Sequence, residues 1–245
     1  MPILPNRVNP AHEAYQANRS ALEAQLAAHD EQLRLVNLGG GEKYIARHRQ
    51  RGKMLVRERV EALLDPDSPF LELSPLAAWG SQFPVGAGTV AGIGVVEGVE
   101  CMITGSDPTM RGGASNPYTL KKSLRTNEII SENRLPTISL TESGGADLPT
   151  QSEIFIPGGR GFRDITQASA AGIPQVSLVF GNSTAGGAYV PGMSDYVVMI
   201  KERSKVFLGG PPLVKMATGE ESDDESLGGA EMHARVSGLA DYFAV

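Results

Sequence analysis

The chain has 245 residues, with 22 Lys and Arg against 28 Asp and Glu, and it is long enough for one large domain with a buried core. Its net charge of −6 gives no general attraction to nucleic acid or to anionic membranes, so an anionic ligand needs a local site. The single Cys101 excludes an internal disulfide and a cysteine-based zinc cluster, and no segment approaches the roughly 20 apolar residues of a membrane span, so we expect a metal-free cytoplasmic protein.

Three helices are predicted within an N-terminal helical segment, residues 9–64. Leucines at helical spacing among Glu, Gln and Ala predict an amphipathic helix over residues 11–35, and three consecutive glycines follow it as a stop signal. A basic helix is predicted over 42–51. A third helix is predicted over 55–64, where an Asp-Pro-Asp turn ends it.

After the helical segment, a β-hairpin is predicted over 86–105, where two Val- and Ile-rich arms flank Glu97-Gly98. Helices and strands then alternate, which is typical of α/β domains whose ligands bind at the strand ends. The acidic run at 220–226 is interpreted as a solvated surface loop. The predicted elements between are helix 119–135, strand 137–140, helix 162–172, strand 175–180, helix 188–194, and strands 195–200 and 205–210.

Two glycine-containing loops follow predicted strands. The first loop (residues 141–149) contains Gly144-Gly145, and the second loop (residues 182–189) contains Gly186-Gly187 and opens a helix. Glycines at a strand end let the backbone approach a ligand closely, and the first N–H groups of a helix lack intrahelical partners. Two such groups converging on one oxygen would form an oxyanion hole, with each donor worth about 3 kcal/mol of transition-state stabilisation. Each glycine pair alone favours a tight turn or close packing, whereas for the two together a functional site and a packing role stay equal alternatives.

Motifs for other chemistry are missing from the sequence. It contains no GxGxxG dinucleotide fingerprint, no GxxxxGK[ST] phosphate loop, no HExxH and no Gly-x-Ser-x-Gly. The four histidines are scattered, and each is interpreted as a surface or structural residue: His12, His29, His48 and His233.

Both loops, and further segments along nearly the whole chain, carry a family resemblance. The segments include TGSDPTMRGGA, SLTESGGADLP, STAGGAYVPGMSD and FLGGPPLVKMATGE. By these the chain resembles the crotonase superfamily and, within it, the carboxyltransferase β subunits of biotin-dependent acyl-CoA carboxylases. GGADLP and AGGAYVPGMSD are more similar to the methylcrotonyl-CoA and geranyl-CoA type than to the propionyl-CoA type. The resemblance implies an α/β, crotonase-like fold of the ClpP/crotonase superfamily, with helices around a twisted β-sheet core.

The resemblance also implies site residues. The thioester carbonyl of an acyl-CoA would lie between the amides of Gly145 and Ala146 and those of Gly186 and Gly187, which are the expected catalytic residues. Carboxybiotin, carried by a partner protein or domain, would supply the carboxyl group, and the biotin anion would take the substrate proton. No strong protein base is then needed. The residues expected to bind substrate are Ser143, Gly144, Thr184, Ala185, Ala188, Tyr189, Phe207, Gly210 and Pro211.

By the same resemblance, residues 1–245 are expected to form one N-terminal carboxyltransferase domain, with the second, C-terminal carboxyltransferase domain absent from this chain. The expected partners are a biotin carboxylase or biotin carboxyl carrier subunit, and other copies in a homo-oligomer that includes the C-terminal domain. Since that domain supplies the biotin-facing wall, we expect this chain alone to bind acyl-CoA without carboxylating it.

Other readings of the sequence stay open. A biotin-dependent decarboxylase or transcarboxylase would use the same site. An enoyl-CoA hydratase or isomerase needs carboxylates that the helix after the second loop lacks, and a non-catalytic assembly subunit would use the loops only for packing. A basic segment could hold CoA phosphates or a partner, but its spacing favours a solvated helix face; it contains Lys43, Arg47, Arg49, Arg51, Lys53, Arg57 and Arg59.

Overall fold

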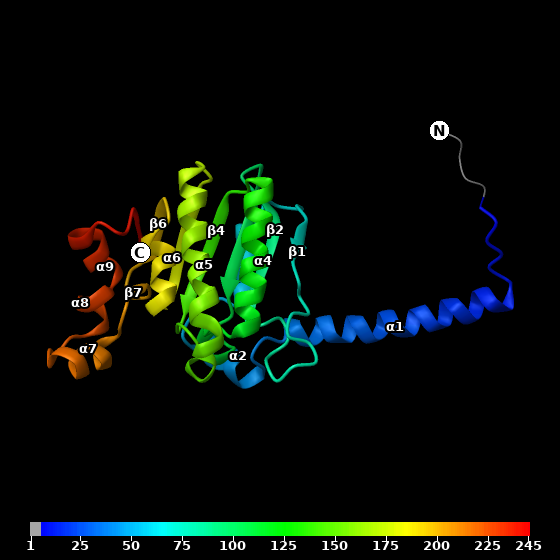
Figure 1. Ribbon diagram of the computed structural model, residues 1–245, viewed down its shortest axis with the longest axis horizontal. Helices are drawn as coiled ribbons and strands as arrows, with labels where there is room; N and C mark the ends of the chain where they lie inside the picture. The colour runs from blue at the N-terminus through cyan, green and yellow to red at the C-terminus, as the bar shows by residue number, and fades with distance from the viewer. Residues whose placement is uncertain (1–5) are drawn as a thin grey trace. The chain divides into compact units, whose positions relative to one another are not determined.

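The computed structural model describes residues 6–245, and the chain forms two compact units that divide between Leu38 and Gly39 (Figure 1). The first unit contains α1, Glu13–Asn37, so the helix predicted over 11–35 is confirmed. Exposed ion pairs one turn apart, such as Arg19–Glu23 at 2.6 Å, add little to the stability of such a helix, because solvent screens them.

The second unit begins with two short helices, which confirm the other two predicted in the N-terminal segment. α2 spans Glu42–Gln50 and α3 spans Val56–Leu63. The carboxylate of Glu58 accepts the N–H of Leu55 at 2.7 Å, which satisfies a donor at the start of α3 that the helix itself leaves free.

A mixed eight-stranded sheet forms the centre of the second unit, in the order β1-β2-β3-β4-β5-β6-β8, and β7 pairs with the end of β5. β1, β2 and β3 run antiparallel, and every later pairing is parallel. The strands are β1 Phe70–Glu72, β2 Thr89–Val96, β3 Val99–Ser106, β4 Thr137–Ser143, β5 Gln175–Thr184, β6 Tyr196–Ile200, β7 Lys205–Phe207 and β8 Tyr242–Ala244.

The predicted hairpin is confirmed as β2 and β3, which pair in register from Thr89 opposite Ser106 to Val96 opposite Val99. The two residues between them, Glu97 and Gly98, have φ angles of 50° and 75°. Two left-handed residues in succession make the tight turn whose twist matches that of paired strands, and the Glu-Gly sequence suits it because glycine adopts this conformation without strain.

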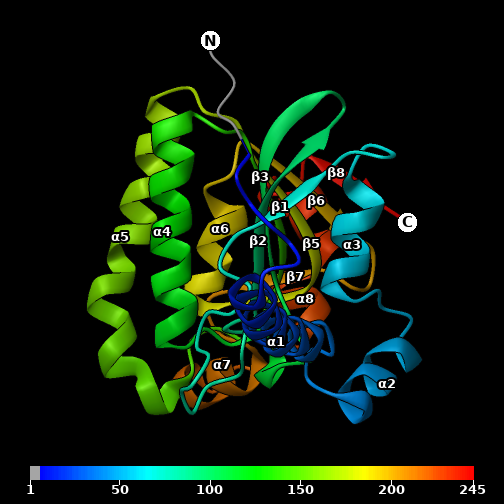
Figure 2. The same ribbon diagram turned by 90° about the vertical axis from the view of Figure 1, so that its right-hand side faces the viewer.

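Helices cover both faces of the sheet (Figure 2). α4, Pro117–Asn133, and α5, Gln151–Ala170, lie side by side on one face, and α3 lies on the other. Successive residues of β3 serve the two layers: Ile103 packs with the valines of α3, and Met102 packs with Ile130 of α4. This alternation is what a strand buried on both faces requires.

One lysine lies inside the layer between α4 and the sheet. Lys122 is 5% exposed, and its Nζ donates to the carbonyl oxygen of Thr89 at 2.8 Å. Burial disfavours the charged ammonium group and lowers the pKa of Lys122 to about 8, although nearby Glu72 opposes the change.

Three predicted elements differ from the structure. α5 begins at Gln151 rather than at 162, since the helix continues through Pro157 and the glycines after it, which usually interrupt helices. β5 continues to Thr184 rather than ending at 180, because its last residues pair with β7. The acidic run at 220–226 is largely exposed as expected, but its end forms the start of a helix capped by Asp223.

The remaining helices are short and follow β5. They are α6 Tyr189–Gly192, α7 Pro211–Thr218, α8 Asp224–Gly228 and α9 Ala230–Met232, which continues into a π-helical turn at His233–Ser237. Within residues 6–245, the helices are too short or too polar to cross a membrane.

Candidate functional site

The ends of β4 and β5 bring the two glycine loops together. The strands are parallel neighbours, and Ser143 at the end of β4 pairs with Ser183 near the end of β5. Because parallel strands end at the same edge of a sheet, the first and second loops emerge side by side. We call the meeting point the loop junction; it consists of Ser143–Ala146 and Thr184–Ala188.

Close approaches across the junction involve its glycines. A Cβ atom on Gly145 would lie 3.4 Å from the carbonyl oxygen of Thr184 and 3.6 Å from Cβ of Ala185. A Cβ atom on Gly187 would lie 3.5 Å from Cβ of Ser143. Gly145 also has a φ of 93°, which side chains other than hydrogen rarely permit. The structure therefore brings the expected catalytic residues of both loops into one site.

Hydrogen bonds already engage the N–H of Gly145. It donates to Oγ of Ser143 at 3.1 Å, and that hydroxyl donates to the carbonyl oxygen of Gly113 at 2.9 Å. The carbonyl of Gly145 accepts the N–H of Ser115 at 2.8 Å. By contrast, the N–H of Ala146 reaches no acceptor within residues 6–245. Within the junction, the N–H of Ala146 is thus a donor of the first loop that has no acceptor among the described residues.

The second loop turns directly from β5 into a helical turn, Ala185–Ala188, which continues into α6. Ala185 makes the turn with a φ of 54°, a strained value for a residue with a side chain. Oγ of Ser183 donates to the carbonyl oxygen of Gly187 at 2.8 Å and fixes the turn. Gly186 is exposed and Gly187 is half-buried, and the first N–H groups of a helix have no partners inside it.

An aromatic pair lies beside the second loop. The expected substrate residue Tyr189 is exposed, and its ring lies 4.8 Å from that of Phe162, centroid to centroid. A Cβ atom on Gly186 would lie 3.8 Å from Cζ of Phe162. Phe162 was not among the expected site residues, because a single aromatic residue carries no motif.

The three expected residues after the second loop lie at the end of β7. Phe207 pairs with Thr184, so its backbone adjoins the second loop. Its ring is buried, and a Cβ atom on Gly210 would lie 3.5 Å from it. Gly210 caps α7 and Pro211 is the first residue of that helix. The structure therefore places the backbone of Phe207 at the junction, and its role in binding substrate stays a prediction.

A buried ion cluster lies at the start of the first loop, where β4 ends. Glu142 bonds Nη2 of Arg59 through Oε2 at 2.6 Å and Nζ of Lys53 through its other oxygen, and the Arg59 side chain is 1% exposed. The guanidinium of Arg59 also lies 4.4 Å from the centre of the Phe180 ring. A Cβ atom on Gly181 would lie 2.6 Å from Oε1 of Glu142, so the absent side chain at 181 makes room for the carboxylate.

This cluster corrects the interpretation of the basic segment as a solvated helix face. Lys53 and Arg59 face inward to Glu142, and Arg57 pairs with Glu72 at 2.7 Å. The interpretation is therefore wrong for these three residues, because each is paired with an acid. The acid that pairs with Lys53 and Arg59 lies more than eighty residues away in the sequence. The other members, Lys43, Arg47, Arg49 and Arg51, are exposed.

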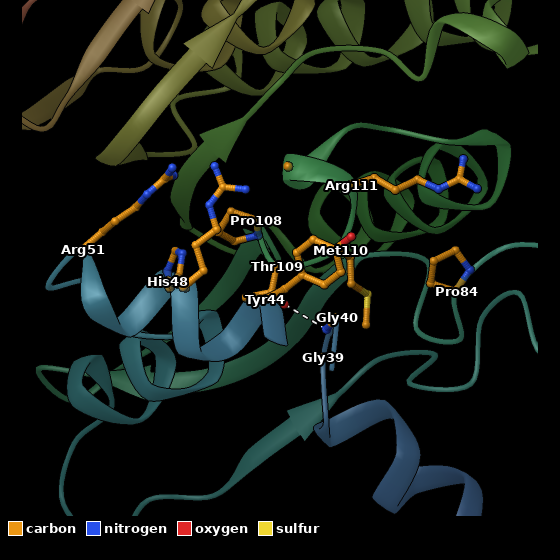
Figure 3. Close-up of a pocket in the computed structure, with 12 residues that line it drawn as sticks. Gly39, Gly40, Tyr44, His48, Arg51, Pro84, Pro108, Thr109, Met110 and Arg111 are labelled. Atoms are coloured by element: carbon orange, nitrogen blue, oxygen red, sulfur yellow. Dashed lines mark hydrogen bonds between the residues drawn. The ribbon is translucent and has the colours of Figure 1, made fainter. Parts of the chain in front are cut away.

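A cavity of about 510 Å³ adjoins the first loop (Figure 3). The N–H of Gly144 donates at 3.0 Å to the carbonyl oxygen of Gly112, a residue that lines this cavity. Most of the residues that line it come from α2, from the C-cap residue of that helix and from the segment after β3, and they include Tyr44, Arg47, His48, Arg51, Met110 and Arg111. We call this the basic cavity.

The two buried histidines have structural hydrogen bonds. Nε2 of His48 lies 3.1 Å from the carbonyl oxygen of Met54, and Nε2 of His233 lies 2.8 Å from that of Val206. Within residues 6–245, His, Cys, Asp and Glu side chains form no group of three or more that could hold a metal ion.

Comparisons with known proteins agree with this geometry. The chain is 68% identical over 243 residues to the probable biotin-dependent acyl-coenzyme A carboxylase beta2 subunit of Mycobacterium tuberculosis, covering 99% of this chain and 46% of the relative. It is 48% identical over 248 residues to the mitochondrial methylcrotonoyl-CoA carboxylase beta chain of Arabidopsis thaliana, covering 99% and 42%. The chain thus spans under half the length of these relatives.

Solved structures give the same result. The beta subunit of P. aeruginosa geranyl-CoA carboxylase matches with a TM-score of 0.92 and 45% identity, over 99% of this chain and 46% of that one. Transcarboxylase 12S matches with a TM-score of 0.80 and 28% identity, over 91% and 44%. The expected fold, an α/β, crotonase-like mixed sheet with surrounding helices, is confirmed. Since the carboxyl transferase domain model also matches residues 47–245, the chain belongs to the carboxyl transferase domain family, close to the β subunits of biotin-dependent acyl-CoA carboxylases.

Proposed function

We propose that this chain provides the acyl-CoA side of a carboxyltransferase in a biotin-dependent acyl-CoA carboxylase. The supporting observation is the loop junction, where two glycine loops from parallel strands meet and the N–H of Ala146 is free. The names of the relatives, which are carboxylase beta subunits, support the same activity.

At the junction, the thioester oxygen would accept one hydrogen bond from the N–H of Ala146 and one from the helical turn at Gly186 or Gly187. Negative charge grows on this oxygen as the substrate becomes an enolate, so fixed donors stabilise the enolate more than the starting thioester. The N–H of Gly145 is already bonded to Ser143, and its part is to shape the loop. Gly145 is thus a positioning residue in this proposal.

No residue of the junction has a carboxylate or imidazole that could remove the substrate proton. Glu142 is buried between two cations, and Asp147 pairs with Arg111 at 3.2 Å. Carboxybiotin on a partner would supply both the carboxyl group and the proton acceptor. The junction fits such a reactant because Gly144, Ala185 and Gly186 are exposed, which leaves one side of the thioester open to it.

The missing side-chain base also bears on the alternatives. Addition of water to an enoyl-CoA needs a positioned carboxylate, and the helix that follows the second loop has none. Reverse or coupled transfer, as in transcarboxylase 12S, would use the same junction and is the second candidate.

The rest of the assembly is proposed from the same relatives. We propose a second carboxyltransferase domain outside residues 1–245, a biotin carboxylase or biotin carboxyl carrier partner, and a homo-oligomer. The 12S transcarboxylase structure is described as a hexamer assembly, which is the kind of state to look for. A cytoplasmic location stays a prediction.

Thermal unfolding with a panel of thioesters tests the acyl-CoA proposal. A ligand that binds only the native state adds about 2.7 kcal/mol of stability at one hundred times its Kd. We expect 3-methylcrotonyl-CoA or geranyl-CoA to raise Tm with concentration, with acetyl-CoA as a shorter comparison and free 3-methylcrotonate as the control. No change in Tm with any thioester would contradict the proposal.

A further inference from the structure

Two serine hydroxyl groups adjoin the loop junction, one from each of its strands. A Cβ atom on Gly187 would lie 3.6 Å from Oγ of Ser143 and 3.6 Å from Oγ of Ser183, so both hydroxyl groups lie next to the same residue of the second loop. Ser183 is fully buried and Ser143 is half-buried. The amides proposed as oxyanion donors belong to other residues, so the function of these two side chains is a separate question.

An irregularity in the pairing of β4 with β5 brings the two serines together. Up to Thr141, each paired residue of β4 has its partner 38 positions later in the chain, whereas Ser143 is paired with Ser183, 40 positions later. Regular pairing would have put Gly181 opposite Ser143. The irregularity therefore replaces a residue without a side chain by one with a hydroxyl group. Strand irregularities are frequent beside active sites, where they re-aim a side chain.

The hydroxyl group of Ser143 holds the first loop through two hydrogen bonds. Its Oγ donates to the carbonyl oxygen of Gly113 at 2.9 Å and accepts the N–H of Gly145 at 3.1 Å. The next peptide group is held from the same segment, because the N–H of Ser115 donates to the carbonyl oxygen of Gly145 at 2.8 Å. A peptide group is planar, with its N–H and C=O on opposite sides, so the direction of the N–H of Ala146 is set as well.

The hydroxyl group of Ser183 holds the second loop. Ala185 begins the helical turn with a φ of 54°, and a residue with a side chain keeps such a strained conformation only where its surroundings enforce it. Oγ of Ser183 donates to the carbonyl oxygen of Gly187 at 2.8 Å and ties the end of this turn back to β5. Without that bond the turn is freer to relax, and the N–H groups of Gly186 and Gly187 lose their fixed direction.

We propose that Ser143 and Ser183 are positioning residues of the oxyanion hole, in which each hydroxyl group orients the amides of its own loop. This rests on the proposed function, where the thioester oxygen accepts hydrogen bonds from both loops. Such donors stabilise a transition state because they are aimed in advance at the point where charge develops. Ser143, one of the expected substrate-binding residues, thus acts through its loop. Loss of either hydroxyl group should slow the reaction step more than it weakens acyl-CoA binding.

Steady-state kinetics of the complete carboxylase test this assignment, with 3-methylcrotonyl-CoA, geranyl-CoA and acetyl-CoA as substrates. In Ser183→Ala and in Ser143→Ala, kcat should fall about tenfold or more while KM for the thioester stays within about twofold, because a misdirected donor is lost mainly from the transition state. Ser143→Thr keeps a hydroxyl group and should recover most of the kcat that Ser143→Ala loses.

Ser177→Ala is the matched control. Ser177 lies on the same strand as Ser183, is also fully buried, and has a hydrogen-bonded hydroxyl group, 2.8 Å from that of Ser194. Because Ser177 does not bond either loop, its variant should keep the kcat of the unaltered enzyme.

Two results would overturn the positioning role while leaving the proposed function intact. One is an unchanged kcat in Ser183→Ala and Ser143→Ala, and the other is an equal fall of kcat in Ser177→Ala. Failure of the unaltered carboxylase to carboxylate any of the three thioesters would overturn the proposed function, and the positioning role with it.

Discussion

The loop junction and the basic cavity share a wall but are built from different parts of the chain. The junction consists mainly of backbone, held in place by two neighbouring strands and by hydrogen bonds of Ser143 and Ser183. The cavity instead presents long side chains from a short helix, two of them without a partner among the residues described. The junction is suited to binding one oxygen atom at a fixed point. The basic cavity is suited to a group with several oxygen atoms, because its long side chains can adjust their positions to them.

The difference in rigidity has an energetic consequence. Preorganised amides need no rearrangement when charge develops, so their contribution belongs to the reaction step. Flexible arginines lose rotamer freedom when they bind, so part of their interaction energy is offset and their contribution belongs to affinity. Changes in the junction should therefore alter turnover, and changes in the cavity should alter binding.

The largest expected effect is on stability, and it comes from the ion cluster that contacts both regions. Glu142 lies at the start of the first loop and accepts a hydrogen bond from Arg59, whose Nη2 lies 3.3 Å from Nε2 of His48 in the wall of the cavity. Glu142→Ala would leave the buried Arg59 and the partly buried Lys53 without their carboxylate, at a cost of about 3–5 kcal/mol in the free energy of unfolding. Urea denaturation measures the loss.

The exposed ion pair Arg19–Glu23 provides the control for that experiment. Glu23→Ala should change the free energy of unfolding much less than Glu142→Ala does, because solvent screens this exposed pair. Equal losses in Glu142→Ala and Glu23→Ala would show that the buried cluster does not support the first loop.

The next effect is on turnover at the junction. Gly187→Val would place two methyl groups against Ser143 and Ser183 and move the second loop away from the thioester oxygen. If one oxyanion donor is displaced, kcat of the complete carboxylase should fall about 100-fold. Gly192→Ala, where an added Cβ meets nothing within 4 Å, is the control. Full turnover in a folded Gly187→Val enzyme would remove Gly187 from the site.

The smallest expected effect is the pH dependence of stability that comes from Lys122. The pKa of Lys122 is about 8 in the folded protein against 10.5 as its ordinary value, so between these values the unfolded chain holds a proton that the folded chain lacks. The free energy of unfolding from this group therefore rises with pH across that window, and below pH 8 the full cost of burying the charge is present.

Lys122→Met should accordingly be more stable than the unaltered protein at pH 7, by about 1–3 kcal/mol, with the advantage shrinking toward pH 10. The loss of the hydrogen bond to Thr89 reduces the gain. Denaturation curves at pH 7, 8.5 and 10 measure the difference. A constant difference across the three pH values would show that Lys122 does not titrate in this range.

How much of the fold and of the site could be predicted from the sequence depends on how far apart along the chain the interacting residues lie. The hairpin at Glu97-Gly98 and the pairing of the two glycine loops follow from local rules, and both were predicted. The start of α5 was not, because Pro157 usually ends a helix and here does not. Local pattern decides an element only where packing agrees with it.

The ion cluster at Glu142 and the basic cavity could not be predicted in this way. Lys53 and Arg59 meet an acid 89 and 83 residues away, and a charge pattern on one helix does not reveal a partner at that distance. Arg47 and Arg51 have the same spacing signal as their paired neighbours. Only the fold separates the arginines that stabilise it from those left for a ligand.

Gly181 and Glu142 are 39 residues apart in the sequence, but they share one space in the fold because Gly181 has no side chain. A methyl group there would occupy the volume now taken by the carboxylate of Glu142, 2.6 Å from Oε1. The two positions therefore compete for one space, and a larger residue at 181 is compatible only with a shorter one at 142. Among related sequences, the identities at these two sites should vary together, and an Asp or Ser at 142 is what would permit an alanine at 181.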